Sequence, residues 1–299
     1  MVMSLDLSGL KATVLGGDER ETETLRLLQQ QGAVVDAYGC PPSAEKVLGR
    51  PQANSVRAAL DGAAIVICPI PYPAADGSLY APQSKEKVYL SVDDLSTLAP
   101  GAVLITGVAT DVMRTAETTL DFQLREYEHD NDLMILRASA IAEGAAAVAI
   151  QHSPVTIHRS SIVLTGFGRT GVALGSLLVA MHARVTVIAR NPVARAIAYQ
   201  MGMESYSFEH LNDVIKNADM IFNTAPALLF TRQVLAHIPE DTVLIDMSAP
   251  PGGVDRDAAS DLGVHFVWAR GLGGVAPRTV AQSQWIGITR LLQAAGIQA

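Results

Sequence analysis

The chain has 299 residues, which is enough for two domains of ordinary size. It is 49% hydrophobic and 17% charged with a formal net charge of −8, which argues against a surface that binds a nucleic-acid backbone. The two cysteines, Cys40 and Cys68, have no metal-type spacing, and the seven histidines form no HExxH pattern. We therefore expect no nucleic-acid partner, no bound metal and no disulfide framework.

The first part of the chain alternates between short apolar runs and helix-forming runs. Lys11–Leu15 predicts a strand, Gly16 and Gly17 predict a turn, and residues 19–31 predict a helix. Strands that alternate with helices require right-handed crossovers, so this part predicts a doubly wound parallel sheet. The further elements predicted here are strands at 33–38, 63–68, 102–106 and 133–136 and a short helix at 91–98.

A second alternating series follows. The stretch 139–152 is rich in Ala and ends just before Pro154, which predicts a helix that links two domains. The chain therefore predicts an α/β fold of two doubly wound parallel-sheet domains, the second of the Rossmann dinucleotide-binding type. The elements predicted after the linking helix are strands at Ser161–Thr165, Arg184–Ile188, 220–222, 243–245 and 265–267, a helix that ends at Met181, and a terminal helix over 277–295.

Neither a signal peptide nor a membrane span is predicted. The N-terminal segment lacks the basic start and the long apolar core of a signal peptide. The most apolar long run, 141–150, contains Glu143 and Gly144 and is shorter than the roughly 18 to 20 residues that a membrane helix needs. We therefore expect a cytoplasmic protein without membrane contact.

The strongest motif is a glycine turn that follows the strand Ser161–Thr165 and opens a helix. Its glycines fit the GxGxxG fingerprint, which places the pyrophosphate of a dinucleotide against free N–H groups at a helix N-terminus. The alternative is a purely structural glycine-rich turn. The residues of the motif, all expected at the cofactor, are Gly166, Phe167, Gly168, Arg169, Thr170 and Gly171.

The end of the next strand bears on the choice of nicotinamide cofactor. An NAD enzyme usually carries Asp or Glu there, which binds the ribose 2′-hydroxyl. This chain has Arg190 and Asn191 instead, with Arg195 one turn further on. Because an arginine can pair with a 2′-phosphate that a carboxylate would repel, NADP is favoured. The alternative is that Arg190 is a solvated surface charge and that either cofactor is accepted.

Two later strand ends are expected at the same edge of the second sheet. Asn223 and Thr224 could bond the ribose, and Ala225 and Pro226 would fix the loop. After the strand at 243–245 come Asp246, Met247 and Ser248, which could border the nicotinamide. For Asp246, a catalytic role and a loop-capping role remain open.

A glycine-rich loop that starts at Gly271 leads into the terminal helix. Arg278 and Thr279 stand at the start of that helix, where their side chains are plausible carboxylate binders. A plain surface role for Arg278 is the alternative.

Taken together, these segments resemble the A-type family of dipicolinate synthase components, essentially from end to end. More distantly, the chain resembles the D-2-hydroxyacid and alanine dehydrogenases, in which a substrate domain precedes the Rossmann domain and a late helix crosses back. The resemblance implies a substrate domain over 1–138, to which residues 277–299 return, and an NADP-binding domain over 139–276. It is carried by VLGGD at 14–18, AEGAAAVAIQH at 142–152, TIH at 156–158, LTGFGRTG at 164–171, FNTAP at 222–226, PPGG at 250–253 and GLGGVAPRT at 271–279.

The resemblance implies an NADP-dependent oxidation of dihydrodipicolinate, derived from the lysine pathway, to dipicolinate during spore formation. It also implies the flavoprotein-like B-type component of dipicolinate synthase as partner, a homo-oligomer, and a place in the mother-cell cytoplasm of a sporulating bacterium. Two alternatives stay open: a reductase of another small keto or imino acid, and a nucleotide-binding regulatory component whose partner performs the chemistry.

The resemblance also implies candidate residues at the substrate. A dicarboxylate needs donors, which we expect from Arg278 or from backbone N–H groups near Gly16 and Gly107. Pro250 stands where some relatives are expected to have an arginine, so no substrate contact is predicted there. Further substrate contacts are expected at Gly17, Asp18, Ser139, Gly144, Gly271 and Thr279, and the candidate general bases are Glu143, His152 and Asp246.

Overall fold

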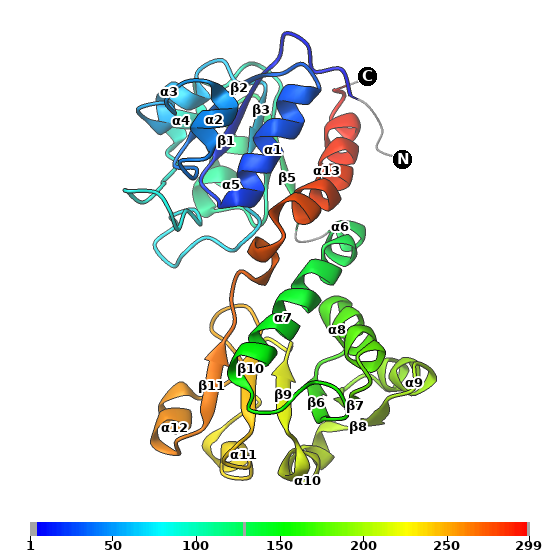
Figure 1. Cartoon of the computed structure of the whole chain (residues 1–299). Coiled ribbons are helices and arrows are strands. Elements are labelled where there is room, and N and C mark those ends of the chain that lie inside the picture. The colour runs from blue at the N-terminus through cyan, green and yellow to red at the C-terminus, as the bar shows by residue number, and fades with distance from the viewer. Residues whose placement is uncertain (1–4, 128–129, 298–299) are drawn as a thin grey trace. The chain divides into compact units, whose positions relative to one another are not determined.

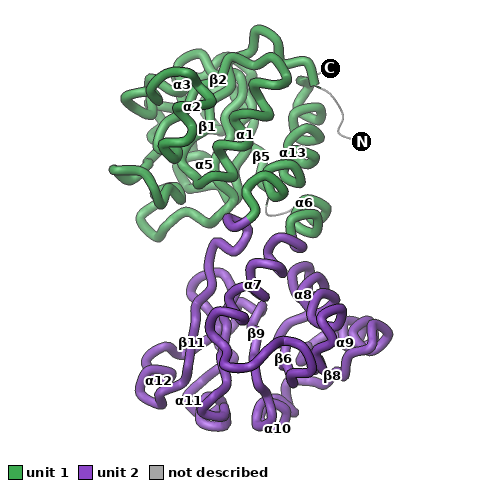
Figure 2. The backbone as a smooth tube through the Cα atoms, in the orientation of Figure 1, with its two compact units in different colours: residues 1–137, 276–299 green, residues 138–275 purple. Residues whose placement is uncertain are grey.

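The structure is a computed structural model that describes residues 5–127 and 130–297. The chain forms two compact units, one made of residues 1–137 and 276–299 and the other of residues 138–275 (Figure 2). The second unit is therefore one continuous segment, inserted into the chain of the first.

Unit 1 contains a five-stranded sheet in the order β2-β1-β3-β4-β5, with every neighbouring pair parallel. The central strands are short runs of Val, Ile, Leu and Ala, and all three residues of β3 are buried, as expected for strands that are covered on both faces. Its strands are β1 (Lys11–Leu15), β2 (Val34–Tyr38), β3 (Ile65–Ile67), β4 (Ala102–Thr106) and β5 (Phe122–Glu126).

Each face of this sheet has its own apolar core. On one face, residues such as Val14, Ile67 and Ile105 pack with Leu25 of α1 and Trp285 of α13. On the other face, strand residues pack against the short helices α3, α4 and α5. The helices of unit 1 are α1 (Glu19–Gln30), α2 (Ala44–Leu48), α3 (Val56–Leu60), α4 (Val92–Leu95), α5 (Asp111–Glu117), α6 (Asn131–Leu136) and α13 (Pro277–Ala294) (Figure 1).

The strand predicted at 133–136 is wrong, because these residues belong to helix α6. The Asp130 side chain accepts a hydrogen bond from the Leu133 backbone N–H at 3.0 Å, which caps the helix. Ile135 and Leu136 are exposed, so the run does not form a buried strand. The fifth strand is instead β5, an edge strand in which Phe122 and Leu124 are buried.

Unit 2 contains a six-stranded parallel sheet in the order β11-β10-β9-β6-β7-β8. The chain starts at β6, winds outward through β7 and β8, and returns to β9 on the other side of β6. Its direction of winding therefore reverses between β6 and β9, and such a switch point is where doubly wound sheets bind their ligands. The strands are β6 (Ser161–Thr165), β7 (Arg184–Ile188), β8 (Glu204–Tyr206), β9 (Met220–Asn223), β10 (Val243–Asp246) and β11 (His265–Trp268).

Helices cover both faces of this second sheet. Buried residues of α7 and α8, among them Ala145 and Leu174, pack on one face, and residues such as Leu211, Leu235 and Ala258 pack on the other. The helices of unit 2 are α7 (Ala138–His152), α8 (Arg169–Ala180), α9 (Pro192–Gln200), α10 (Leu211–Val214), α11 (Arg232–Leu235) and α12 (Arg256–Asp261), with 3-10 turns at Phe208–His210, Ile215–Asn217 and Leu272–Val275.

By length and composition alone, the helical stretch Asn131–His152 is apolar enough to cross a membrane, with a mean hydropathy of 1.7 in its most apolar window. This corrects the expectation that no apolar stretch is long enough. The core helix of a globular domain passes the same test. Ala142, Ala145, Ala146 and Ala149 of α7 are buried in the core of unit 2, which accounts for the apolar composition of this helix.

Candidate functional site

The glycine turn lies between β6 and α8, at the switch point of the second sheet. Gly166 has a φ of +87°, and a Cβ there would lie 2.5 Å from Thr224 Oγ1. A Cβ on Gly171 would lie 2.6 Å from the Gly166 carbonyl oxygen. Both positions therefore require glycine because of the packing of the turn itself.

Gly168 differs from the other two glycines of the turn. Its φ of −94° is open to any residue, and a Cβ there would meet no atom within 4 Å. Neither backbone conformation nor packing within the protein therefore explains this glycine. Close approach of a ligand does explain it, since the middle glycine of this fingerprint makes room for a pyrophosphate.

The N-terminus of α8 is open toward such a ligand. Gly168 is the N-cap and supplies no side-chain hydrogen bond, and the first turn of α8 carries no acidic residue. Arg169 and Thr170 are half-buried or exposed in this turn, whereas the Phe167 side chain is buried in the core and anchors the turn. The geometry fits an anionic group at the helix N-terminus.

The predicted residues at the end of β7 have distinct surroundings. Arg195 Nη1 donates to the carbonyl oxygens of Ala189 and Arg190, both at 2.9 Å. Asn191 caps α9 by accepting from the Val193 N–H at 2.9 Å. Arg190 is exposed, and among the described residues its side chain has no recorded hydrogen bond or ion pair. Arg190 is thus the cation at this strand end whose guanidinium is uncommitted.

Asn223 does not suit the ribose contact that the sequence suggested. Its side chain is fully buried, and its Oδ1 accepts from Thr165 Oγ1 at 2.7 Å and from the Ala225 N–H at 3.1 Å. Its Nδ2 donates to Ala225 O and to Asp246 Oδ1. Because all of its polar atoms are engaged internally, Asn223 ties the ends of the neighbouring strands together.

Asp246 has the loop-capping role rather than the catalytic one. Its Oδ1 accepts from Asn223 Nδ2, from Ser248 Oγ at 2.6 Å and from the Ser248 N–H at 3.0 Å. Its Oδ2 accepts from the Gly253 N–H at 2.7 Å. With the residue 1% exposed and both oxygens occupied, the carboxylate holds the loop after β10 in place. Ser248 is buried with it, while Met247 is half-buried.

The loop after β9 packs directly on the glycine turn. Thr224 Oγ1 donates to the Thr165 carbonyl at 3.1 Å and lies next to the position of a Gly166 Cβ. Ala225 is half-buried and Pro226 is exposed. The ends of β6, β7, β9 and β10 therefore meet at the carboxyl edge of one sheet, as the sequence predicted.

Helix α7 contacts the glycine-rich loop that follows β11. A Cβ on Gly144 would lie 2.7 Å from the Leu272 carbonyl oxygen, so Gly144 is required for close packing and does not face a ligand. Glu143 and Ser139 are exposed on the same helix, and Gly271, with a φ of +69°, is exposed in the loop. This contact brings the first half of α7 to the carboxyl edge of the sheet.

His152 is at the opposite edge and does not suit a catalytic role. Its ring centroid lies 5.6 Å from that of His265, which is the first residue of β11. His152 is therefore at the amino-terminal ends of the parallel strands, whereas the glycine turn follows their carboxyl ends. This separation corrects the assignment of His152 as a candidate base.

In unit 1, the predicted N–H donors are bonded within the protein. The Gly16 N–H donates to Tyr38 O at 2.8 Å, the Gly17 N–H to Tyr80 O at 2.7 Å, and the Gly107 N–H to Pro69 O at 3.1 Å. A Cβ on Gly107 would lie 1.9 Å from the Ile70 carbonyl oxygen, so this glycine is needed for packing. These glycines shape the turns and do not offer donors to a carboxylate.

Asp18 caps α1 and is paired with an arginine that sequence reasoning missed. Arg20 Nε and Nη2 donate to the two Asp18 carboxylate oxygens at 2.8 and 2.7 Å, and both side chains are buried. Burial raises the pKa of Asp18, but the hydrogen bonds and charge of Arg20 outweigh it and hold the pKa below its usual value. Asp18 is therefore a structural carboxylate rather than a free substrate contact.

Glu21 completes this turn and was also missed. Its Oε2 accepts from the Asp18 N–H at 2.8 Å, which forms a capping box with Asp18. Burial raises the pKa of the Glu21 carboxyl to about 7, even though the Arg20 charge lowers it. The spacing of Asp18 and Glu21 was the signal that could have revealed this pair.

Arg278 and Thr279 stand at the start of α13, in unit 1. Arg278 Nε lies 3.8 Å from Glu23 Oε1, and the Arg278 side chain is 81% exposed. The structure therefore leaves this guanidinium open to a carboxylate from solution.

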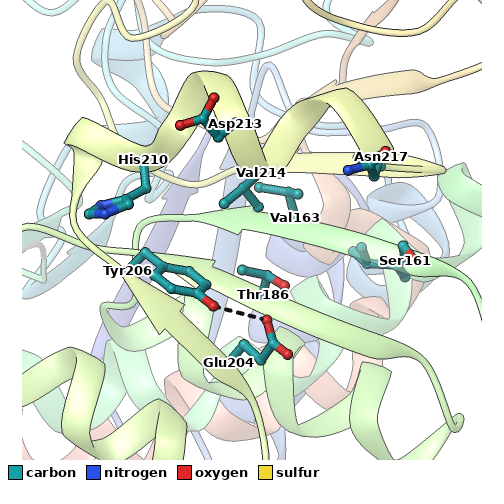
Figure 3. A pocket seen from close by; sticks show the side chains of 11 residues that line it. Ser161, Val163, Thr186, Glu204, Tyr206, His210, Asp213, Val214 and Asn217 are labelled. Carbon is teal, nitrogen blue, oxygen red and sulfur yellow. Dashed lines mark hydrogen bonds between the residues drawn. The ribbon is translucent and has the colours of Figure 1, made fainter.

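A separate pocket of about 390 Å³ opens on one face of the second sheet (Figure 3). Strands β6, β7 and β8 contribute Val163, Thr186 and Glu204, and His210 and Asp213 lie opposite them. Its β6 residues all belong to the first half of the strand, so this pocket is distinct from the glycine turn that follows β6. Across residues 5–127 and 130–297, no cluster of three or more His, Cys, Asp or Glu could hold a metal ion.

Two known families match the two units. Residues 11–127 match the N-terminal domain of the A-type component of dipicolinate synthase. Residues 137–258 match the NAD binding domain of D-isomer specific 2-hydroxyacid dehydrogenases. The second match supports a nicotinamide dinucleotide cofactor and an oxidoreductase, in agreement with the glycine turn described above.

Relatives extend these matches over nearly the whole chain. The A-type component of dipicolinate synthase from Bacillus subtilis (strain 168) is 29% identical over 277 residues, which are 92% of this chain and 93% of that protein. The crystal structure of the corresponding component from Bacillus halodurans is 26% identical with a TM-score of 0.85, and the match covers 96% of this chain and 98% of that one.

A more distant likeness concerns the fold alone. An L-alanine dehydrogenase has a TM-score of 0.61 at 14% identity, over 96% of this chain and 89% of that one. The predicted fold class, two parallel-sheet α/β domains with dehydrogenase-like architecture, is thereby confirmed. The chain belongs to the A-type family of dipicolinate synthase components, and its second unit is a dehydrogenase NAD-binding domain.

Proposed function

We propose that this chain is an NADP-dependent dehydrogenase that oxidises dihydrodipicolinate to dipicolinate in the mother-cell cytoplasm of a sporulating bacterium. The observation that carries the proposal is the open turn at Gly168, where a Cβ would meet nothing and α8 has no side-chain cap. The A-type component of dipicolinate synthase is a relative that matches both units.

The preference for NADP rests on the end of β7. Arg190 is exposed and uncommitted, and Arg195 holds the backbone carbonyls of residues 189 and 190 in place. A guanidinium at this position can make a bidentate pair with a 2′-phosphate. Among residues 184–195 there is no Asp or Glu that would repel the phosphate.

The cofactor, when bound, accepts the hydride that leaves the substrate ring. The protein then has to orient the ring and accept one proton. Of the predicted bases, Asp246 is saturated with hydrogen bonds and His152 lies at the wrong edge of the sheet. Glu143 is exposed on α7 next to Gly144, which contacts the loop after β11, so we propose Glu143 as the proton acceptor.

The test is formation of dipicolinate by the purified chain, followed by its ultraviolet absorbance. Dihydrodipicolinate would be supplied with NADP or NAD, with and without the flavoprotein-like B-type component. Product from the chain alone, faster with NADP, is the expected result. The Glu143→Gln variant should lose turnover while it keeps its affinity for NADP.

A second candidate function is that of a nucleotide-binding regulatory component whose partner performs the chemistry. It is favoured by one observation, namely that two of the three predicted bases do not suit proton transfer. Tight NADP binding without turnover of dihydrodipicolinate or of a panel of small keto and imino acids would support it. Turnover by the isolated chain would exclude it.

A further inference from the structure

Helices α1 and α13 lie side by side in unit 1 (Figure 1), and a groove of about 330 Å³ runs between them. Leu27 and Ala281 contribute apolar surface to the groove, and Gln30 and Gln282 contribute carboxamides. The charged lining residues are Glu23 and Arg26 of α1 and Arg278 of α13. Neither the cofactor turn nor the Asp18 turn contributes to this groove.

The groove holds more positive charge and more hydrogen-bond donors than its own acceptor can satisfy. Arg26 Nη1 lies 2.9 Å from Glu23 Oε1, and Arg278 Nε lies 3.8 Å from the same oxygen. Two guanidinium groups therefore share one carboxylate oxygen, and at 3.8 Å the second contact is too long for a hydrogen bond. The remaining guanidinium N–H groups favour a ligand that brings carboxylate oxygens.

The existing ion pairs would be easily displaced. The side chains of Arg26 and Arg278 are 41% and 81% exposed, and ion pairs of this kind contribute little to stability. Glu23 can therefore turn away from either arginine at small cost. Burial of one ligand face against Leu27 and Ala281 would add an apolar contribution.

We propose that the groove between α1 and α13 binds a small dicarboxylate, with Arg26 and Arg278 each pairing with one carboxylate group. Two cations on opposite helices, with an apolar floor between them, fit a compact ligand that carries an anionic group at each end. The identity of that ligand as dipicolinate or its dihydro form rests on the proposed function, whereas the dicarboxylate class rests on the groove.

Glu23 gives the proposal a prediction of opposite sign. A ligand carboxylate must compete with Glu23 for both arginines and is repelled by its charge. Removing the charge should therefore strengthen binding, whereas removing either arginine should weaken it. Since all three residues are partly exposed on helix surfaces, these substitutions should leave the fold intact.

The experiment is calorimetric titration of the purified full chain with dipicolinate and, separately, with glutarate, at low salt with EDTA. Arg26→Gln and Arg278→Gln should each weaken binding about fivefold, and Glu23→Gln should strengthen it by a similar factor. Arg232→Gln, which removes an exposed arginine paired with Asp261 in unit 2, is the matched control and should change nothing.

The outcomes separate the groove from the proposed function. Glutarate binding with this pattern, without dipicolinate binding, would support the groove and count against the proposed substrate. If the wild-type chain binds neither acid, or if Arg232→Gln weakens binding as much as the groove variants do, the groove proposal is overturned, whatever the chain does with NADP.

Discussion

Arg190 and Arg195 follow the same strand of unit 2, but their side chains have different surroundings. Arg195 donates to two backbone carbonyls, whereas Arg190 is exposed without a recorded partner in the described part of the chain. Arg190→Ser should therefore weaken NADP binding by roughly 10-fold or more, because a charge-assisted phosphate contact is lost, and should leave NAD binding unchanged. Titration of both nucleotides by fluorescence or calorimetry measures this difference.

The control for this prediction is Arg232→Ser, which removes an exposed arginine from α11 and should affect neither nucleotide. A parallel loss of NAD affinity in Arg190→Ser would mean that Arg190 supports the loop and not the 2′-phosphate. Equal affinity of the wild-type chain for both nucleotides would count against the proposed cofactor preference.

Glu21 is a buried acid whose ionisation is coupled to folding. Burial beside Asp18 raises its pKa to about 7 from 4.5, against the opposing charge of Arg20. The folded chain therefore holds this proton more tightly than the unfolded chain does. The resulting stabilisation is complete below about pH 4.5 and is lost as the pH rises to about 7, so it should amount to something on the order of 3 kcal/mol.

The Glu21→Gln variant tests this coupling. Its carbonyl can still accept from the Asp18 N–H, so the capping box is kept, but the titrating group is gone. Urea unfolding between pH 5 and 8 should give a steeper loss of unfolding free energy in the wild-type chain than in the variant. Equal slopes would show that the pKa of Glu21 is the same in the folded and unfolded chains.

The sequence was more informative about backbone roles than about side-chain roles. The three glycines of the cofactor turn could be predicted, because each follows from a backbone requirement that the motif itself encodes. Asp246 could not be assigned, because its four hydrogen bonds come from residues 223, 248 and 253, which only the folded sheet brings together. Arg20 and Glu21 were missed for the same reason, since their importance comes from burial.

At the level of elements, the two β–α turns of the chain have similar glycine-rich sequences and opposite electrostatics. The N-terminus of α1 is closed by Asp18 and Glu21, which satisfy its N–H groups with carboxylates. The N-terminus of α8 has no such cap and no acidic residue in its first turn. Anion binding is therefore expected at α8 and not at α1.

Gly168→Ala tests the open turn directly. Since a Cβ at this position meets nothing within 4 Å and φ is −94°, the variant should unfold at the wild-type temperature within error. The added methyl group should nevertheless obstruct the pyrophosphate and weaken dinucleotide binding by roughly 10-fold or more. Thermal unfolding with and without nucleotide gives both quantities in one experiment.

The comparison variant is Gly166→Ala, which should lower the unfolding temperature even without nucleotide, because its φ is +87° and its Cβ would clash with Thr224. Unchanged nucleotide affinity in Gly168→Ala would remove the main support for a pyrophosphate at this turn.

The misassigned element in unit 1 shows the limit of reading local apolar runs. Residues 133–136 are as apolar as a strand, but the Asp130 cap and the polar residues 131 and 132 begin a helix there. Strand β5 was overlooked because its buried residues alternate with partly exposed ones, as is normal for the edge of a sheet.

At the scale of the whole molecule, each unit has its own sheet and its own apolar cores, and unit 2 is a single segment of chain. A continuous segment with a complete core should fold independently. We therefore expect residues 138–275, expressed alone, to unfold cooperatively and to bind NADP with nearly the affinity of the full chain. At about 100 times its Kd, NADP should add about 2.7 kcal/mol to the unfolding free energy of this fragment. Calorimetry of fragment and full chain tests this expectation, with Gly168→Ala in the fragment as the control that should lose the nucleotide effect. An unfolded fragment, or a folded one that ignores the nucleotide, would mean that the dinucleotide site needs residues of unit 1.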